Sequence, residues 1–131
     1  MVSIHHDNPV NIISAGVNVY VSDVHRSHRW YSEVLGLKME MSPGEQCSRY
    51  SEPLSEDQRL TVFRLLQGSV NQSLLGNVQL AFSAASLEAT VAAMRAAGVG
   101  VARERSYEPG CALPSVTVLD PDGNAIVLYE T

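Results

Sequence analysis

Basic residues are scarce in this sequence. Its 131 residues include 9 Lys+Arg against 14 Asp+Glu, which gives a formal net charge of −5 and a pI of about 5.2. Lys38 is the only lysine, and the arginines form no run. Nucleic acids and anionic membranes bind proteins through basic faces that complement phosphate groups. The composition therefore argues against a nucleic-acid partner and against a membrane partner.

Cysteines and long apolar runs are scarce as well. Cys47 and Cys111 are too few and too far apart for a disulfide framework or a zinc knuckle, and reduced thiols are typical of cytoplasmic proteins. No apolar stretch approaches the ~20 residues that span a bilayer, and the first residues carry no basic-then-apolar signal pattern. We therefore expect a soluble, cytoplasmic protein. With 45% hydrophobic residues, the chain is long enough to form a single domain, 1–131, around one core.

One segment, residues 16–37, encodes a strand, a capped helix and the start of another strand. Apolar and polar residues alternate over 17–21, which is the period of a strand with one buried face. Asp23 is suited to cap the free backbone N–H groups of a helix. Apolar residues then recur at three- and four-residue spacing until Gly36, which favours the left-handed conformation that ends a helix.

The same pattern returns in the second half of the chain. Placing Ser86, the expected cap of a second helix, on Asp23 brings the two alternating strands into register. Similarity at a fixed offset indicates duplicated structural units. We expect an α+β protein with two βαβββ modules, about 12–68 and 78–131, joined by a polar connector over 69–77. One helix covers only one face of each sheet, so the bare faces are expected to form a curved mixed sheet around a cleft.

Two segments also resemble a known family. VSDVHRSHRWYSEVLGL and VLDPDGNAIVLYE are similar to the most recognisable segments of the vicinal oxygen chelate superfamily, which includes glyoxalase I, extradiol dioxygenases, and fosfomycin- and bleomycin-resistance proteins. The similarity covers about 16–130. It implies the fold of this family and, because relatives often pair, a homodimer. It does not by itself imply one reaction, since the family supports many chemistries.

The resemblance also implies where a metal would bind. Enzymes of the family hold a divalent metal through ligands at positions that correspond here to Gly16, Gln79 and Val127, and through a fourth within 60–66. That range contains no His, Asp, Glu or Cys. Glycine and valine carry no donor atom, and one uncharged amide does not hold a divalent ion. We therefore expect neither a metal nor another cofactor in the cleft.

Other potential metal ligands lie outside this pattern. His5 and His6 near the N-terminus, or Cys111, would have to enter the cleft to form an atypical metal site, and the sequence leaves that alternative open. His25 and His28 lie three residues apart on the outer side of the first expected helix. We expect both of these histidines to be solvated.

Strand alternation predicts the residues that line the cleft. Ile126 and Leu128 are expected beneath the second helix, so their neighbours on the last strand face the cleft. The expected ligand-binding residues are Asn18, Tyr20, Arg64, Gln79, Ser83 and Tyr129. Amide, hydroxyl and aromatic groups suit a small organic ligand, on which the tyrosines would stack, while an inward arginine would attract an anion. Two alternatives stay open: that the tyrosines fill the core, and that the arginine lies at an exposed edge.

Two functions of different classes are consistent with these residues. The first is metal-free binding of a small organic molecule, aromatic or anionic, in the manner of bleomycin-resistance proteins. The alternative is a lyase, isomerase or cyclase, metal-independent or with an atypical metal site, that uses Tyr20, Tyr129 or Arg64 in acid–base steps. A metal-dependent glyoxalase-type activity ranks third. We assign no catalytic residue, because the sequence contains no phosphate loop, no G-x-S-x-G elbow and no cysteine with an identifiable histidine partner.

Overall fold

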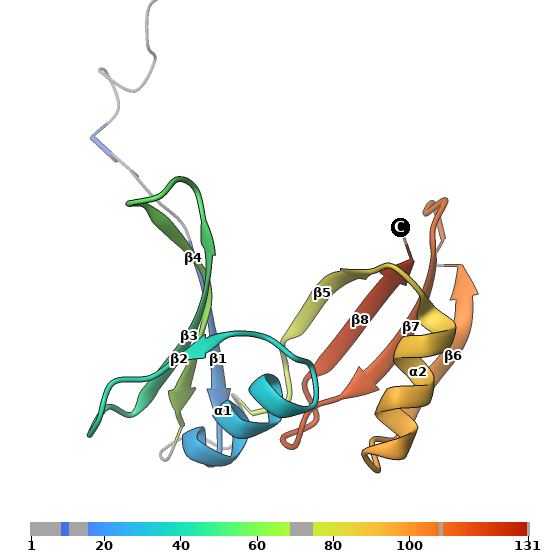
Figure 1. Ribbon diagram of the computed structural model, residues 1–131, viewed down its shortest axis with the longest axis horizontal. Helices are drawn as coiled ribbons and strands as arrows, with labels where there is room; N and C mark the ends of the chain where they lie inside the picture. The colour runs from blue at the N-terminus through green and yellow to red at the C-terminus, as the bar shows by residue number, and fades with distance from the viewer. Residues whose placement is uncertain (1–8, 11–15, 69–74, 108, 131) are drawn as a thin grey trace, which may run out of the picture.

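The described part of the chain contains ten regular elements that repeat one order twice (Figure 1). The computed structural model describes residues 9–10, 16–68, 75–107 and 109–130. The first module consists of β1 (Val17–Val21), α1 (Val24–Glu33), β2 (Met39–Glu40), β3 (Cys47–Pro53) and β4 (Arg59–Gln67). The second consists of β5 (Gln79–Ala84), α2 (Leu87–Ala96), β6 (Val101–Tyr107), β7 (Pro114–Leu119) and β8 (Ala125–Glu130). The two βαβββ modules and the α+β class are confirmed.

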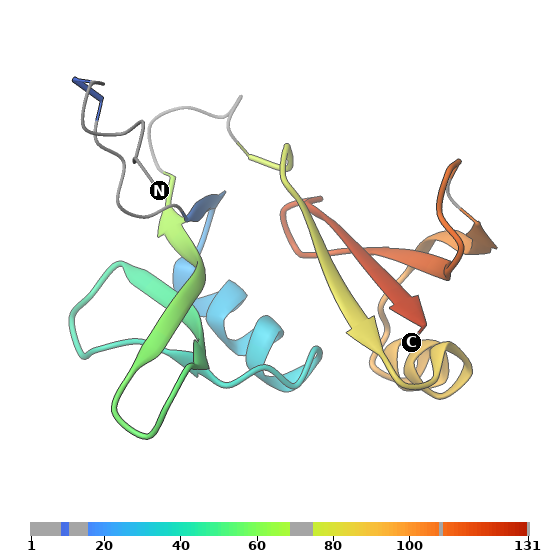
Figure 2. The ribbon, with the colours of Figure 1, turned by 90° about the horizontal axis from the view of Figure 1, so that it is seen from above.

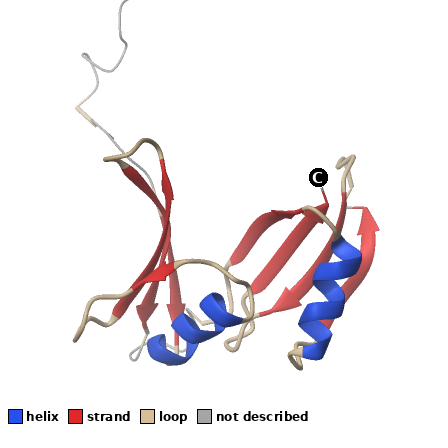
Figure 3. Cartoon of the chain, viewed as in Figure 1, coloured by secondary structure: helices blue, strands red, loops and turns tan. Residues whose placement is uncertain are grey.

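The strands form two four-stranded sheets of equivalent topology, each with one helix (Figure 3). Their orders are β1-β4-β3-β2 and β5-β8-β7-β6. In each sheet the first strand pairs parallel with the last strand of its module, and the other pairs are antiparallel. Within the described residues no strand pairing joins the two sheets, so β1 and β5 are both edge strands. The single curved sheet expected from the sequence is therefore divided into two.

The helices begin and end where the sequence predicts. The Asp23 carboxylate accepts hydrogen bonds of 3.1 Å from the backbone N–H groups of His25 and Arg26 at the start of α1. Ser86 accepts a bond of 3.2 Å from the N–H of Ala89 in the same role at α2. A glycine with positive φ follows each helix, Gly36 at 74° among them. Neither helix is long and apolar enough to cross a lipid bilayer.

The two modules share one hydrophobic core, which lies between the helix-covered faces of their sheets. Tyr31 of α1 packs against Phe63 of β4, and the ring of Phe63 meets that of Phe82 of β5 at a centroid distance of 6.2 Å. The cluster of buried apolar side chains extends from Val19 in the first module to Leu128 in the second. Figure 2 shows α1 lying between the two sheets.

This packing determines where the uncovered sheet faces point. Because the helix-covered faces meet in the core, the open face of each sheet lies on the outside of the molecule. The candidate site must be described on each open face separately.

Candidate functional site

The open face of the first sheet carries an asparagine, a tyrosine and two arginines. Val19 is fully buried against the core, so its neighbours Asn18 and Tyr20 lie on the opposite face, the first exposed and the second half-buried. Arg64 lies beside Asn18 on one side and beside Arg49 on the other, in one row across three strands. Side chains in one row of a sheet share a face, so these polar groups are neighbours on the open surface.

The two arginines of this face differ in whether they have an ion-pair partner. Arg49 is paired with Glu45 at 3.1 Å, whereas Arg64 is exposed and makes no ion pair within the described part of the chain. Its Nη1 atom lies 3.8 Å from the place that a Cβ at Gly16 would occupy. A guanidinium without an ion-pair partner among the described residues therefore lies beside Gly16, the first of the positions to which the family resemblance assigns a metal ligand. Arg64 is exposed, but β4 is an inner strand of its sheet, so the side chain lies on the open face and not at a sheet edge.

The open face of the second sheet carries the other three candidates. Gln79 and Ser83 are exposed on β5, and Tyr129 of β8 is half-buried and in register with Ser83. Val127, expected to line the cleft, is only 1% exposed, so its side chain offers little surface to a ligand. The alternation predicted for β5 is observed, because Leu80 lies on the buried side of the same strand.

The six candidate residues thus form two groups of three rather than one site. Asn18, Tyr20 and Arg64 lie on the first sheet, and Gln79, Ser83 and Tyr129 on the second. Since the open faces point outward from a shared core, the two groups do not converge within one chain. Local alternation predicted the faces of the strands correctly, but it contains no information on how one module packs against the other.

The positions that would hold a metal do not fit one. They present a glycine, an amide and a buried valine, which together offer a single neutral oxygen donor. Over the described ranges there is no group of three or more His, Cys, Asp or Glu side chains able to hold an ion. Cys111 is exposed, and the histidines at positions 5 and 6 lie outside the described residues.

The histidines of α1 differ from one another in environment. His25 is exposed, as expected. The expectation that His28 is solvated is wrong, because the ring is half-buried and its Nδ1 lies 2.7 Å from the Ser48 hydroxyl of β3. His28 therefore fastens the helix to its sheet.

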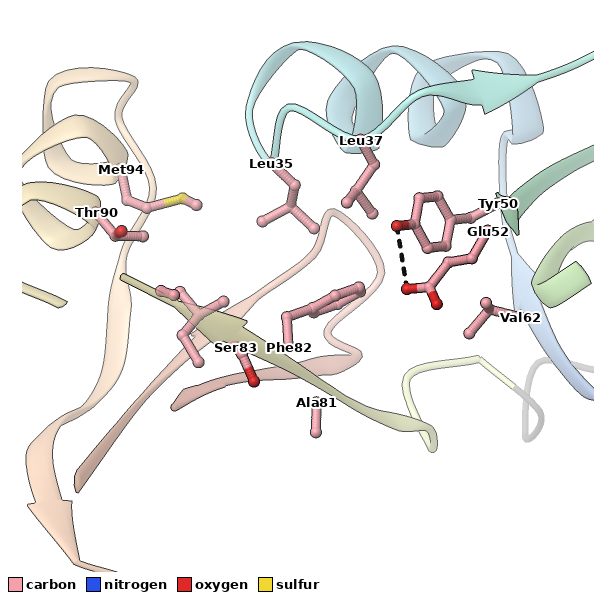
Figure 4. A pocket seen from close by; sticks show the side chains of 12 residues that line it. Leu35, Leu37, Tyr50, Glu52, Val62, Ala81, Phe82, Ser83, Thr90 and Met94 are labelled. Carbon is pink, nitrogen blue, oxygen red and sulfur yellow. Dashed lines mark hydrogen bonds between the residues drawn. The ribbon is translucent and has the colours of Figure 1, made fainter. Parts of the chain in front are cut away.

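A cavity of about 520 Å³ lies between the modules on the helix-covered side (Figure 4). Leu35 and Leu37, which follow α1, point into it together with Phe82 of β5 and Met94 of α2. Ser83 also borders this space, although its hydroxyl points away from the two leucines in Figure 4. Sequence reasoning missed the cavity because most of its walls come from apolar residues of both modules, which read as ordinary core.

Comparison with known proteins shows which family and which solved structures this chain resembles. Residues 13–128 match the Glyoxalase/Bleomycin resistance protein/Dioxygenase superfamily. A solved glyoxalase/bleomycin resistance protein from Catenulispora acidiphila DSM 44928 is 22% identical, with a TM-score of 0.61 over 92% of this chain and 99% of that one. TnmS3, an antibiotic-binding protein from Streptomyces sp. CB03234, is 24% identical, with a TM-score of 0.66 over 92% and 98%.

A second protein from the same Streptomyces strain, described as a glyoxalase/bleomycin resistance protein, is 24% identical, with a TM-score of 0.62 over 88% of this chain and 97% of that one. No curated protein matches the chain. At these identities the solved structures establish a shared fold only. The superfamily match, however, spans both βαβββ modules, and the chain therefore belongs to the Glyoxalase/Bleomycin resistance protein/Dioxygenase superfamily.

Proposed function

We propose that this protein binds a small organic molecule, aromatic and polar or anionic, on its open sheet faces without the help of a metal. The observation that carries the proposal is the free Arg64 guanidinium beside Gly16. A fixed positive charge disfavours a divalent cation at the same place. It also supplies a planar donor group that binds a carboxylate or phosphate through two parallel hydrogen bonds.

The groups around this arginine suit the same kind of ligand. Asn18 adds an amide in the same row, and Tyr20 adds an aromatic ring with a hydroxyl on the same face. An aromatic ring stacks on a flat molecule, and polar groups at its edge fix the orientation. The structural relative TnmS3 is an antibiotic-binding protein, which supports a binding role within this fold.

We further propose that a complete cleft forms between two copies of the chain. The open face with Arg64 in one copy would lie opposite the open face with Tyr129 in the other. Both β1 and β5 are edge strands, and an unpaired strand edge presents backbone N–H and C=O groups to another chain. A two-fold axis would use both edges twice and form two equal clefts, as in a closed homodimer.

Calorimetric titration of the purified protein with a flat aromatic carboxylate, such as 2-naphthoate, and with its neutral amide tests the proposal. We expect the carboxylate to bind more tightly. Arg64→Ala should weaken carboxylate binding ~10-fold or more, because a charge-assisted pair is lost. Arg29→Ala, which removes an exposed arginine from α1, is the matched control and should leave binding unchanged. Equal affinities for both compounds, or no effect of Arg64→Ala, would count against an anion site at this arginine.

A further inference from the structure

We propose that the cavity between the modules is a second ligand site, selective for an organic cation with an apolar body, such as an arylalkylamine. This site lies on the helix-covered side of the sheets, whereas the proposed cleft lies on the open faces. The two sites would therefore take ligands of opposite charge. The inference stands independently of the function proposed above.

The shape and the walls of the cavity suit a small molecule. Its volume of about 520 Å³ falls within the range of ~300–1,000 Å³ that is typical of small-molecule pockets. The leucines Leu35 and Leu37 face Phe82 across it, and Met94 borders it from α2 (Figure 4). The flexible methionine side chain adapts to apolar ligands of different shapes. The cavity is thus built to bury an apolar body.

One wall of this cavity comes from β3 and β4 of the first sheet and includes a carboxylate, that of Glu52. The pairing of β3 with β4 shifts by one residue between Tyr50 and Ser51, so that Val62 is the extra residue on β4. Tyr50 and Glu52, two residues apart on β3, share one face of the strand, and the bulge adds Val62 of β4 to the same space. A regular strand pair would have placed Val62 on the same face as Arg64.

Among the described residues that line the cavity, Glu52 is the only charged one. Within the described residues it makes no ion pair, and its one hydrogen bond comes from the Tyr50 hydroxyl at 3.5 Å. The nearby Arg59 is engaged elsewhere, by Glu40 at 3.3 Å and by the carbonyl oxygen of Ser51 at 3.1 Å. The carboxylate therefore retains acceptor capacity for a ligand.

The aromatic residues beside the cavity also favour a positively charged ligand. Tyr50 and Phe82 both pack against Phe63, at centroid distances of 5.7 Å and 6.2 Å, which holds the two rings beside the cavity. Ring faces attract cations within ~6 Å. Burial, and then the charge of Glu52, raises the pKa of the Tyr50 hydroxyl, so the group stays protonated and donates to the carboxylate. A ligand ammonium near Glu52 would complete this arrangement.

A matched ligand series separates charge from apolar contact. Calorimetric titration at pH 7 would compare 4-phenylbutylamine, 4-phenylbutan-1-ol and 4-phenylbutyrate, which share one apolar body. We expect the amine to bind once per chain and more tightly than the alcohol, and the carboxylate to bind least well to this site. Measuring the series in Arg64→Ala protein removes the proposed anion site, and amine binding should persist there.

Substitutions of residues that line the cavity then test whether the amine binds there. Glu52→Gln should weaken amine binding ~2–5-fold, the effect of losing one exposed charge pair, while Glu56→Gln in the neighbouring loop should change nothing. Ala84→Leu, which adds bulk within the lining, should abolish binding while thermal unfolding verifies the fold. Equal affinity for the amine and the alcohol, or full affinity in Glu52→Gln, would overturn the proposal.

Discussion

The hydroxyl of Tyr31 donates a hydrogen bond of 2.7 Å to Oδ2 of Asp120, and both side chains are buried between the modules. Tyr31 belongs to the first helix, whereas Asp120 opens the Asp-Pro-Asp-Gly turn between β7 and β8. The same carboxylate accepts bonds of 2.8 Å from the backbone and the side-chain amide of Asn124. The turn motif therefore both closes a hairpin and joins the two modules.

Tyr31→Phe tests the contribution of this bond to stability. The substitution keeps the ring but leaves a buried carboxylate oxygen without one of its donors, so the free energy of unfolding should fall by ~1–3 kcal/mol. Urea denaturation followed by circular dichroism measures the change. Tyr107→Phe is the control, because that tyrosine is 57% exposed and should contribute little. Equal stability of the two variants would mean that the bond does not join the modules energetically.

The same tyrosine should make the protein sensitive to alkali. Burial, and next the negative charge of Asp120, raises the pKa of Tyr31 far above its ordinary value of 10.0. Below pH 10 both the folded and the unfolded states keep the proton, and stability is complete. Above pH 10 only the unfolded chain releases it, so the free energy of unfolding should fall as the pH rises further.

Urea denaturation in steps from pH 8 to pH 11 measures this dependence. In Tyr31→Phe the alkaline loss of stability should be smaller than in the unchanged protein, since one of the responsible groups is gone. Tyr50, whose pKa is also raised, would account for part of the remaining slope. Identical slopes in the two proteins would show that Tyr31 titrates normally.

Metal content is a third test. Gly16 and Val127 provide no donor atoms, so protein purified without a metal-affinity tag should contain far less than one equivalent of zinc, nickel, iron or manganese. Treatment with a chelator should leave the midpoint of thermal unfolding unchanged. A stoichiometric metal, lost together with stability on chelation, would point to an atypical site and to the enzymatic alternative.

The elements themselves were predictable because their signals are local. Asp23 and Ser86 cap the helices as the sequence predicts, and strand alternation placed Val19 on the buried side of β1. A capping side chain or an alternating strand depends on a few neighbouring residues, so a single sequence contains the information.

Features that depend on distant contacts were not predictable in the same way. The bulge at Val62 inserts one residue into a strand that reads as regular, and it changes which side chains share a face. His28 reads as an outer helical residue, but its ring nitrogen Nδ1 forms a hydrogen bond with the Ser48 hydroxyl of β3. The helix-covered faces meet at contacts such as that between Phe63 and Phe82, which joins residues of different modules.

The oligomeric state provides a fourth test. Because the open faces diverge within one chain, a complete cleft requires a partner, and light scattering after size exclusion should give twice the chain mass of 14.2 kDa. A charged substitution at the exposed edge of β1, Val17→Lys, should shift the protein toward the monomer. A monomer at all concentrations, with undiminished ligand binding, would contradict the shared cleft.

Mixing two binding-deficient variants tests the shared cleft most directly. Arg64→Ala and Tyr129→Ala would each be expressed alone and then unfolded and refolded together, with 2-naphthoate as the calorimetric probe. In a mixed dimer, one cleft carries both substitutions and the other carries neither. Each variant alone should bind weakly, and the mixture should regain tight binding at about one site per mixed dimer. A mixture that binds no better than its components would show that the two residues do not meet across subunits.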